Sequence, residues 1–187
     1  MQTDTKHLIA ETLVQLLRKK PADKVTVKDV VEACHISRQT FYYHFQDLMD
    51  VMEWTVEQTM QQMLEESIQA ETAEQALQIL VVTVTERVRT LLPKLLESQH
   101  RIRLETLMRK AVHIYLETMI QRRLPEINIA YNDLHVAIDF YSYGIAGLLL
   151  EYSMKENLQP EQLTRQIYQM MNGKLLQVTD SGECNPL

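Results

Sequence analysis

Apolar residues recur at intervals of three and four through almost the whole chain, and this period restricts the fold to helices. Between about residues 5 and 20 such a stripe is formed by Ile9, Leu13, Leu16 and Leu17, which is the spacing of one buried face of an α-helix. Only four glycines and five prolines occur among the 187 residues, too few for the frequent turns of an all-β protein. The sequence therefore predicts an all-α protein of about nine helices.

The first fifty residues predict three short helices and the beginning of a long one. Pro21 closes the first helix, and Thr26 begins a T-x-x-D start signal, related to the capping box, for the second. A tight turn is predicted at His35. Ser37 is then a natural N-cap for the third helix, and Asp47 for the long helix that follows.

The rest of the chain predicts a larger helical body. Thr72 begins an S/T-x-x-Q capping box before the β-branched run ILVVTV, and this cap, together with the length of the segment, favours a helix over a strand. Later helices are predicted at about residues 99–124, 133–156 and 160–178. The predicted division is a head over residues 1–46, a body over residues 47–178 and a disordered tail over residues 179–187.

Two short helices joined by a tight turn describe a helix-turn-helix, whose second helix enters the major groove of double-stranded DNA. In the predicted helix 37–45, Phe41 and Phe45 face the core of the head, and polar and aromatic side chains occupy the other face. Arg38, Gln39 and Thr40 suit base edges, since Arg pairs with guanine, Gln with adenine, and a Thr methyl contacts thymine. Hydroxyls, imidazole and a helix N-terminus suit phosphates. The predicted DNA-binding residues are Thr26, Lys28, Ser37, Arg38, Gln39, Thr40, Tyr42, Tyr43 and His44.

Charge is distributed unevenly along the chain. The net charge is −6, but residues 1–50 hold seven basic and seven acidic residues and are neutral. The acidic excess therefore lies in the body. A neutral head predicts modest DNA affinity for one copy of the protein, which a second copy would increase.

The stretch from Thr26 to Phe45 resembles the DNA-binding head of TetR-family regulators. The family pattern, close to S-x-x-T-x-Y-x-H/Y-F with a capped long helix after it, is matched at Ser37, Thr40, Phe41, Tyr42, His44, Phe45 and Asp47. In the body, the segment GIAGLLLEYSMKENLQPEQL is similar to the DhaS-like branch of that family. Two positions depart from the pattern, since His35 stands where the family usually has Gly, and Leu48 where it often has Lys.

The resemblance implies a homodimeric transcriptional regulator that binds a near-palindromic operator. It implies a four-helix dimer interface made by the last two long helices, and control by a small-molecule effector, here unknown, bound in the helical body. Repression is the usual outcome in the family, and the DhaS-like resemblance leaves activation open.

Two glycines support a self-partner independently of the resemblance. Gly144 and Gly147 lie inside a predicted helix, where each costs about 1 kcal/mol relative to Ala. Close approach of a second backbone explains them, as would tight packing within one chain or a kink beside a pocket. The predicted interface residues are Gly144, Gly147, Leu148, Tyr152, Leu163, Ile167, Met170 and Met171.

A stripe of Met, Leu and Tyr side chains in the body has two readings. It is either plain core or the wall of an adaptable cavity, because Met fills irregular space. Two arginines could receive an anionic ligand, although solvated or ion-paired arginine is commoner. The candidate pocket residues are Met60, Met63, Arg103, Leu104, Met108, Tyr115, Met119 and Tyr141.

Two alternatives to a ligand-controlled DNA-binding protein stay open. One is a helical sensor that acts through a protein partner without specific DNA binding. The other is a metal-responsive protein, because His113 with Glu117 and His135 with Asp139 are spaced i,i+4, although such pairs are mostly surface hydrogen bonds.

Enzyme activity, a cofactor, a resident metal and a membrane span are not expected. The chain has no Gly-rich phosphate loop, G-x-S-x-G elbow or H-E-x-x-H motif. The longest apolar run, residues 145–150, is too short to cross a bilayer. Cys34 and Cys184 suggest neither a disulfide framework nor a metal site, and no secretory signal is recognisable. The sequence therefore predicts a cytoplasmic protein.

Overall fold

Nine α-helices make up most of the part of the chain that the structure describes, which confirms the all-α prediction. The computed structural model describes residues 2–87, 91–123, 130–155, 157, 159–173, 176–178 and 184–186. The helices are α1 (Gln2–Lys19), α2 (Val27–Cys34), α3 (Arg38–His44), α4 (Leu48–Gln69), α5 (Ala73–Val82), α6 (Leu92–Leu96), α7 (Arg101–Arg123), α8 (Tyr131–Ser153) and α9 (Pro160–Met171). A 3₁₀ turn at Ala22–Lys24 follows α1, and a π-helical turn at Thr83–Arg87 follows α5.

Side-chain caps begin four of these helices, as predicted. The side chains of Thr26, Ser37, Asp47 and Thr72 each accept a hydrogen bond from the backbone N–H three residues later. At Thr26 and Thr72 the capping box is complete, because the side-chain oxygen of the residue three positions later accepts a hydrogen bond from the backbone N–H of the cap residue. An N-cap of this kind stabilises a helix by about 1 kcal/mol, so local chemistry fixes where these helices begin.

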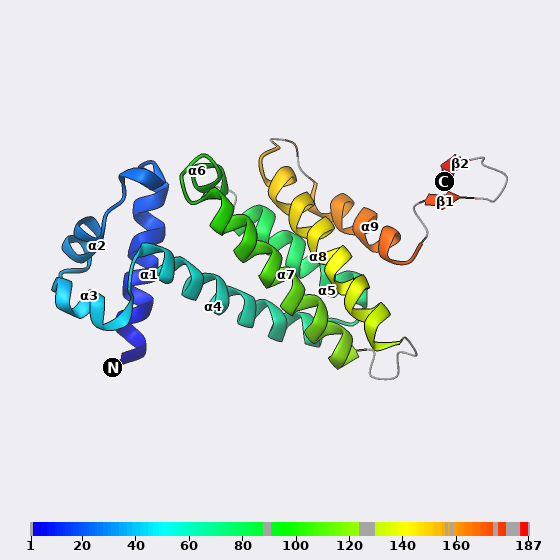
Figure 1. Cartoon of the computed structure of the whole chain (residues 1–187), viewed down its shortest axis with the longest axis horizontal. Coiled ribbons are helices and arrows are strands. Elements are labelled where there is room, and N and C mark those ends of the chain that lie inside the picture. Colours follow the sequence, from blue (N-terminus) through cyan, green and yellow to red (C-terminus); the bar gives the residue numbers. More distant parts are fainter. Residues whose placement is uncertain are drawn as a thin grey trace.

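Helices α1, α2 and α3 form a head at one end of the molecule, and α4 runs from this head into the body (Figure 1). In the body α4 packs on α5 and α7, α7 packs on α8, and α5 packs on α9. The 22-residue α4 is therefore the main covalent and packing link between the two parts.

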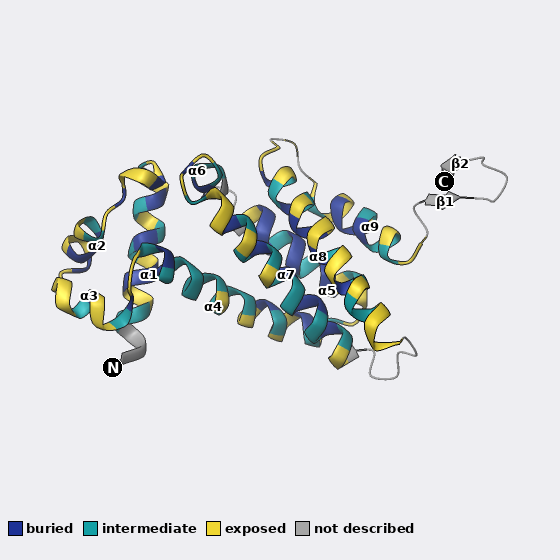
Figure 2. Cartoon of the chain, in the orientation of Figure 1, coloured by how far each residue is buried: buried dark blue, intermediate teal, exposed yellow. Residues whose placement is uncertain are grey.

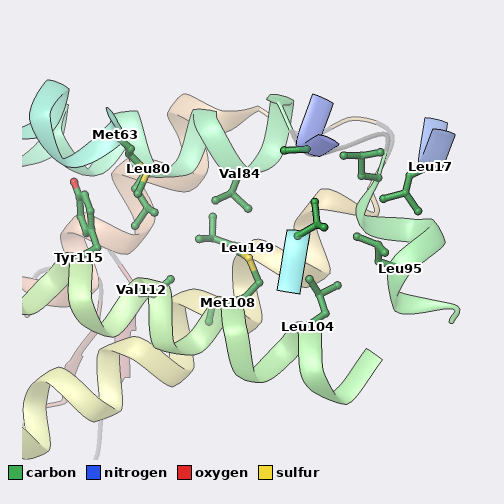
Figure 3. Packing of buried hydrophobic residues seen from close by; sticks show 14 of the residues in the cluster. Leu17, Met63, Leu80, Val84, Leu95, Leu104, Met108, Val112, Tyr115 and Leu149 are labelled. Atoms are coloured by element: carbon green, nitrogen blue, oxygen red, sulfur yellow. The ribbon is translucent and has the colours of Figure 1, made fainter. Parts of the chain in front are cut away.

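Buried residues line the inner faces of the helices, and exposed residues their outer faces (Figure 2). The buried side chains form one cluster that extends from the head, at Ile9 and Phe41, to Ile167 on α9. Figure 3 shows Leu17 of α1 and Leu95 of α6 at one end of the labelled residues, and Met63 and Tyr115 at the other. Burial of each large apolar side chain stabilises the folded protein by about 1.5–3 kcal/mol. Burial of this cluster is therefore the main source of stability for the packing of the helices.

The C-terminal end differs from the sequence prediction in two ways. α9 ends at Met171 and not near Val178, because Gly173 takes a left-handed conformation with φ of 64° and its N–H bonds the Met170 carbonyl. Strand β1 (Leu176–Val178) then pairs antiparallel with β2 (Cys184–Pro186). Among the residues of the predicted tail, 184–186 form β2, and the others lie outside those described.

Candidate nucleic-acid interface and ligand cavity

The turn between α2 and α3 sets the angle of the helix-turn-helix. His35 takes the left-handed conformation, with φ of 54° and ψ of 39°. Its N–H bonds the Glu32 carbonyl, and the Ile36 N–H bonds the Val31 carbonyl at 3.0 Å. These two bonds form a Schellman motif, which usually has Gly at the left-handed position. His35 therefore adopts the left-handed backbone conformation for which the family usually has Gly.

Helix α3 is anchored by two aromatic rings on its inner side. Phe41 is 0% exposed and Phe45 is 3% exposed, and both belong to the main hydrophobic cluster. Tyr42 and Tyr43 point the other way and are 57% and 71% exposed. The buried rings thus hold one side of α3 on the head and leave the opposite side to solvent.

Arg38 and Gln39 lie in the first turn of α3 and are exposed. Within the described part of the chain, neither side chain makes a hydrogen bond or an ion pair. A guanidinium and an amide without intramolecular partners, at the start of the second helix of a helix-turn-helix, are placed as readers of base edges would be.

Ser37, Thr26 and Lys28 are exposed, and each also makes a contact within the head. The Ser37 hydroxyl accepts the Thr40 N–H at 2.9 Å and lies 2.9 Å from the Thr40 hydroxyl, so Ser37 positions the helix start. The exposed Thr26 hydroxyl donates to Asp29 at 2.6 Å. Lys28 lies 3.7 Å from Glu32 in an exposed ion pair, which is weak enough to be exchanged for a phosphate.

The start of α2 is tied to the end of α1 by an ion pair. Lys20 Nζ lies 2.7 Å from Asp29 Oδ2, and the same carboxylate accepts the Thr26 N–H at 2.7 Å. The hydrogen bond from Lys20, followed by those from Thr26, lowers the pKa of Asp29 from 3.8 to about 2. This carboxylate therefore both caps α2 and joins it to α1.

Leu48, the position where the family often has Lys, is partly buried and packs against the hydrophobic cluster. A possible cationic contact to phosphate is replaced by packing at the start of α4. The Asp47 cap remains, accepting the Asp50 N–H at 2.8 Å.

A cavity of about 260 Å³ lies between α4, α7 and the π-helical turn, and it reaches α1. Four of the predicted pocket residues line it, namely Met60, Met63, Leu104 and Met108. Sequence reasoning missed the wall supplied by the head. That wall is Leu13, Val14 and Leu17 of α1, and the other lining residues missed include Thr55 and Thr59 of α4, and Leu91 and Leu95 beside or within α6.

The other four predicted pocket residues do not line this cavity. Arg103 is exposed and bonds Glu53 at 2.8 Å, so it joins α7 to the start of α4. Tyr115 is buried, and its hydroxyl donates to the Ala76 carbonyl at 2.7 Å. Met119 is core, and Tyr141 is partly buried against that core.

Helix α8 presents an exposed apolar face. Gly144 and Gly147 lie on it, and a Cβ added at either glycine would meet no atom within 4 Å. The two glycines are therefore not explained by packing inside one chain. The large apolar residues exposed on α8 are Tyr131, Val136, Phe140 and Tyr143, with Met154 just after its end.

The remaining predicted interface residues fall into three groups. Leu163 and Ile167 are buried in the chain's own core, where α9 packs on α5. Leu148, Tyr152 and Met171 are partly buried against that core, and Met170 is exposed. The large apolar residues exposed on α8, from Tyr131 to Tyr143, therefore precede Leu148 and Tyr152 along the helix.

Within the described residues, His113 does not form an ion pair with Glu117, nor His135 with Asp139. His113 Nε2 lies 3.3 Å from Asp139 Oδ1 on α8, and the His135 ring packs edge-on against Tyr131 at 4.2 Å. Over the residues that the structure describes, no group of three or more His, Cys, Asp or Glu side chains converges as a metal site would require.

Cys34 is a buried free thiol in the core of the head. No helix within the described ranges is long and apolar enough to span a membrane.

Solved structures with this fold are known. The chain is similar to the dihydroxyacetone kinase operon activator DhaS, with a TM-score of 0.70, 18% identity, and 91% of this chain and 95% of that chain covered. It is also similar to the TetR family repressor AlkX from Dietzia sp. strain DQ12-45-1b, implicated in biodegradation of n-alkanes (TM-score 0.62, 19% identity, 89% and 94% covered). A third is the fatty acid degradation regulator FadR from Bacillus halodurans (TM-score 0.57, 16% identity, 91% and 95% covered). No curated protein sequence matches the chain.

Two family models match the chain, and together they cover the head and the body. Residues 9–47 match the model of bacterial regulatory proteins of the tetR family. Residues 71–173, more than half of the chain, match the model of a transcriptional regulator C-terminal region. The chain therefore belongs to the TetR family of transcriptional regulators.

Proposed function

We propose that this protein is a homodimeric, sequence-specific DNA-binding regulator that acts in the cytoplasm. The observation that carries the proposal is the construction of α3. Phe41 and Phe45 fix its inner side, while Arg38 and Gln39 extend from its first turn without intramolecular partners. In a helix-turn-helix these are the positions that meet base edges.

A second copy of the chain would pair through the exposed face of α8. That face carries Phe140 and Tyr143 beside Gly144 and Gly147, so aromatic side chains flank a strip where a second backbone can approach closely. Two heads related by a two-fold axis would read a near-palindromic operator. Pairing would also offset the modest affinity of a neutral head.

A small molecule in the cavity would control DNA binding, because the cavity lies where α1 and α4 meet the body. A ligand that fits one arrangement of the heads better than another shifts the dimer toward that arrangement. We propose repression as the outcome. The similar AlkX is named a repressor and DhaS an activator, so the direction of regulation needs its own measurement.

The test is DNA binding by fluorescence anisotropy, with the intergenic DNA beside the protein's own gene as the probe, unrelated DNA as control, and a salt series. We expect selective binding that weakens steadily with salt, because phosphate contacts release counterions. Equal binding to both DNAs at every salt concentration would overturn sequence-specific recognition.

The Arg38→Ala variant tests whether α3 contacts the bases. Loss of one base contact should weaken binding to the preferred sequence by about 1–3 kcal/mol and relax the preference at one base pair. Arg122→Ala, an exposed arginine near the end of α7, is the matched control and should bind as wild type. If Arg38→Ala keeps both affinity and preference, α3 does not read bases.

A further inference from the structure

The cavity is walled partly by the head itself. Leu13, Val14 and Leu17 of α1 form that wall, and Leu91 and Leu95, beside and within α6, lie on the body side. Figure 3 shows Leu17 next to Leu95 at this end of the cluster. A molecule in the cavity would therefore contact the head directly, and would also contact α4, which leads to the head.

One lysine joins α6 to the end of α1 beside the cavity. Lys94, on α6 between Leu91 and Leu95, donates from Nζ to the carbonyl of Leu17 at 2.9 Å and to that of Arg18 at 2.5 Å. These carbonyls belong to the last turn of α1, where no intrahelical donor remains and the helix dipole is negative. An ammonium satisfies both needs, so Lys94 is a C-cap supplied to the head by the body.

Leu17 contributes to both features, since its side chain lines the cavity and its carbonyl receives Lys94. Further contacts hold the same junction: the Gln99 N–H bonds Asp23 Oδ1 at 3.3 Å. The first half of α1 is held separately on α4, where the His7 ring meets Trp54 at 4.9 Å. A ligand that separates Leu17 from Leu95 would thus lengthen the Lys94 bonds while the other half of α1 stays in place.

The lining indicates the class of ligand. Among the residues that the structure describes, no side chain that lines the cavity is charged. The hydroxyls of Thr55 and Thr59 already donate to the carbonyls of Val51 and Thr55. Gln62 and Thr83 are the other polar residues of the lining. A charged group placed here would lose its hydration without gaining an oppositely charged partner among the described residues, at a cost of several kcal/mol. An uncharged, largely apolar molecule would lose little.

We propose that an uncharged, largely apolar ligand binds in this cavity against α1, and that Lys94 is the residue through which its binding is transmitted to the head. In the unliganded protein Lys94 holds the end of α1 on α6. Ligand binding favours the state in which that bond is broken. The inference rests on the proposed function only for its effect on DNA.

The binding site is tested with N-phenyl-1-naphthylamine, an uncharged apolar fluorophore, titrated into the full-length protein. We expect saturable binding that is displaced by 1-decanol and at least about tenfold less well by decanoate, which carries a charge. Ala111→Phe, which fills the cavity from α7, should abolish probe binding. Equal displacement by decanoate, or unchanged binding to Ala111→Phe, would overturn the assignment of ligand class or site.

The role of Lys94 is tested with Lys94→Met, which keeps most of the length of the side chain and removes its charge. Lys110→Met, on the exposed side of α7, is the control. Hydrogen exchange of amides at the end of α1 should rise in wild type with the probe, and in Lys94→Met without it. Lys94→Met should also bind the probe at least about fivefold more tightly, because coupling is reciprocal. Lys110→Met should match wild type in both.

DNA binding supplies the last comparison. Lys94→Met without probe should have the DNA affinity of wild type saturated with probe, and should not respond further. If Lys94→Met leaves α1 exchange and probe affinity at the wild-type values, the inference is wrong. If both change as expected while no variant binds DNA selectively, the coupling stands and the proposed function fails.

Discussion

His35 shows how a single residue can occupy a conformation that its side chain disfavours. Its φ of 54° is required by the two hydrogen bonds that close α2, and a residue with a Cβ pays roughly 1–2 kcal/mol for that conformation. His is better tolerated there than most residues. The histidine is exposed, so burial does not explain its presence.

His35→Gly should therefore raise the free energy of unfolding, by up to about 1 kcal/mol once the greater freedom of glycine in the unfolded chain is included. Urea denaturation followed by circular dichroism measures it. Ala33→Gly, an exposed residue of the same helix, is the control and should lower the free energy of unfolding. Destabilisation by both variants would mean that the imidazole makes a favourable interaction.

Among the helical elements, the start of α2 depends on the charge of Asp29. A carboxylate whose pKa is lowered from 3.8 to about 2 in the folded protein binds its proton less readily folded than unfolded. It therefore stabilises the folded head at pH values above about 4, and this contribution disappears as the pH falls from about 4 to about 2.

Asp29→Asn should lower the thermal stability of the protein at pH 6, and its difference from wild type should shrink steadily between pH 4 and pH 2. Thermal melts across this range measure the effect. Glu32→Gln, an exposed acid of the same helix, should show a smaller dependence on pH. A constant difference between wild type and Asp29→Asn down to pH 2 would contradict the role of the ion pair.

Helix starts could be predicted from the sequence because their causes are local. Thr26, Ser37, Asp47 and Thr72 each bond a backbone N–H three residues away, and this spacing is visible in the sequence. The end of α9 is also marked locally, by Gly173 with its positive φ, although the predicted helix extends to about residue 178.

Partners far apart in the sequence could not be predicted. Lys94 bonds carbonyls of residues 76 and 77 positions earlier, and nothing in the spacing of either segment indicates the other. For the same reason Arg103 was considered for an anionic ligand, whereas the structure pairs it with Glu53. Four of the eight predicted pocket residues line the cavity, and its wall from α1 depends on contacts between distant segments that the sequence does not show.

At the scale of the whole molecule, the exposed face of α8 is the feature that one chain alone does not explain. Phe140 is 71% exposed and Tyr143 is 64% exposed, although both lie in a regular helix with a buried opposite side. Contiguous exposed aromatic residues mark interaction surfaces. A second copy provides the matching apolar face by symmetry.

Phe140→Glu should dissociate the proposed dimer, raising its dissociation constant by at least about 100-fold, because two unpaired carboxylates would be buried near the two-fold axis. Sedimentation equilibrium measures the change, and circular dichroism should show unaltered helix content. Gln61→Glu, on the exposed side of α4, is the control and should remain dimeric. Retention of the dimer by Phe140→Glu would move the interface away from this face of α8.

Trp54 is the sole tryptophan of the chain, and it lies where α4 meets both His7 of α1 and Phe45 at the end of α3, with ring centroids 4.9 Å and 5.9 Å away. Its ultraviolet emission therefore comes from a single site between head and body. Any shift of α1 along α4 alters the polarity around that indole and hence the colour and lifetime of its emission. Trp54 fluorescence therefore reports movement of the head in stopped-flow experiments without an added label.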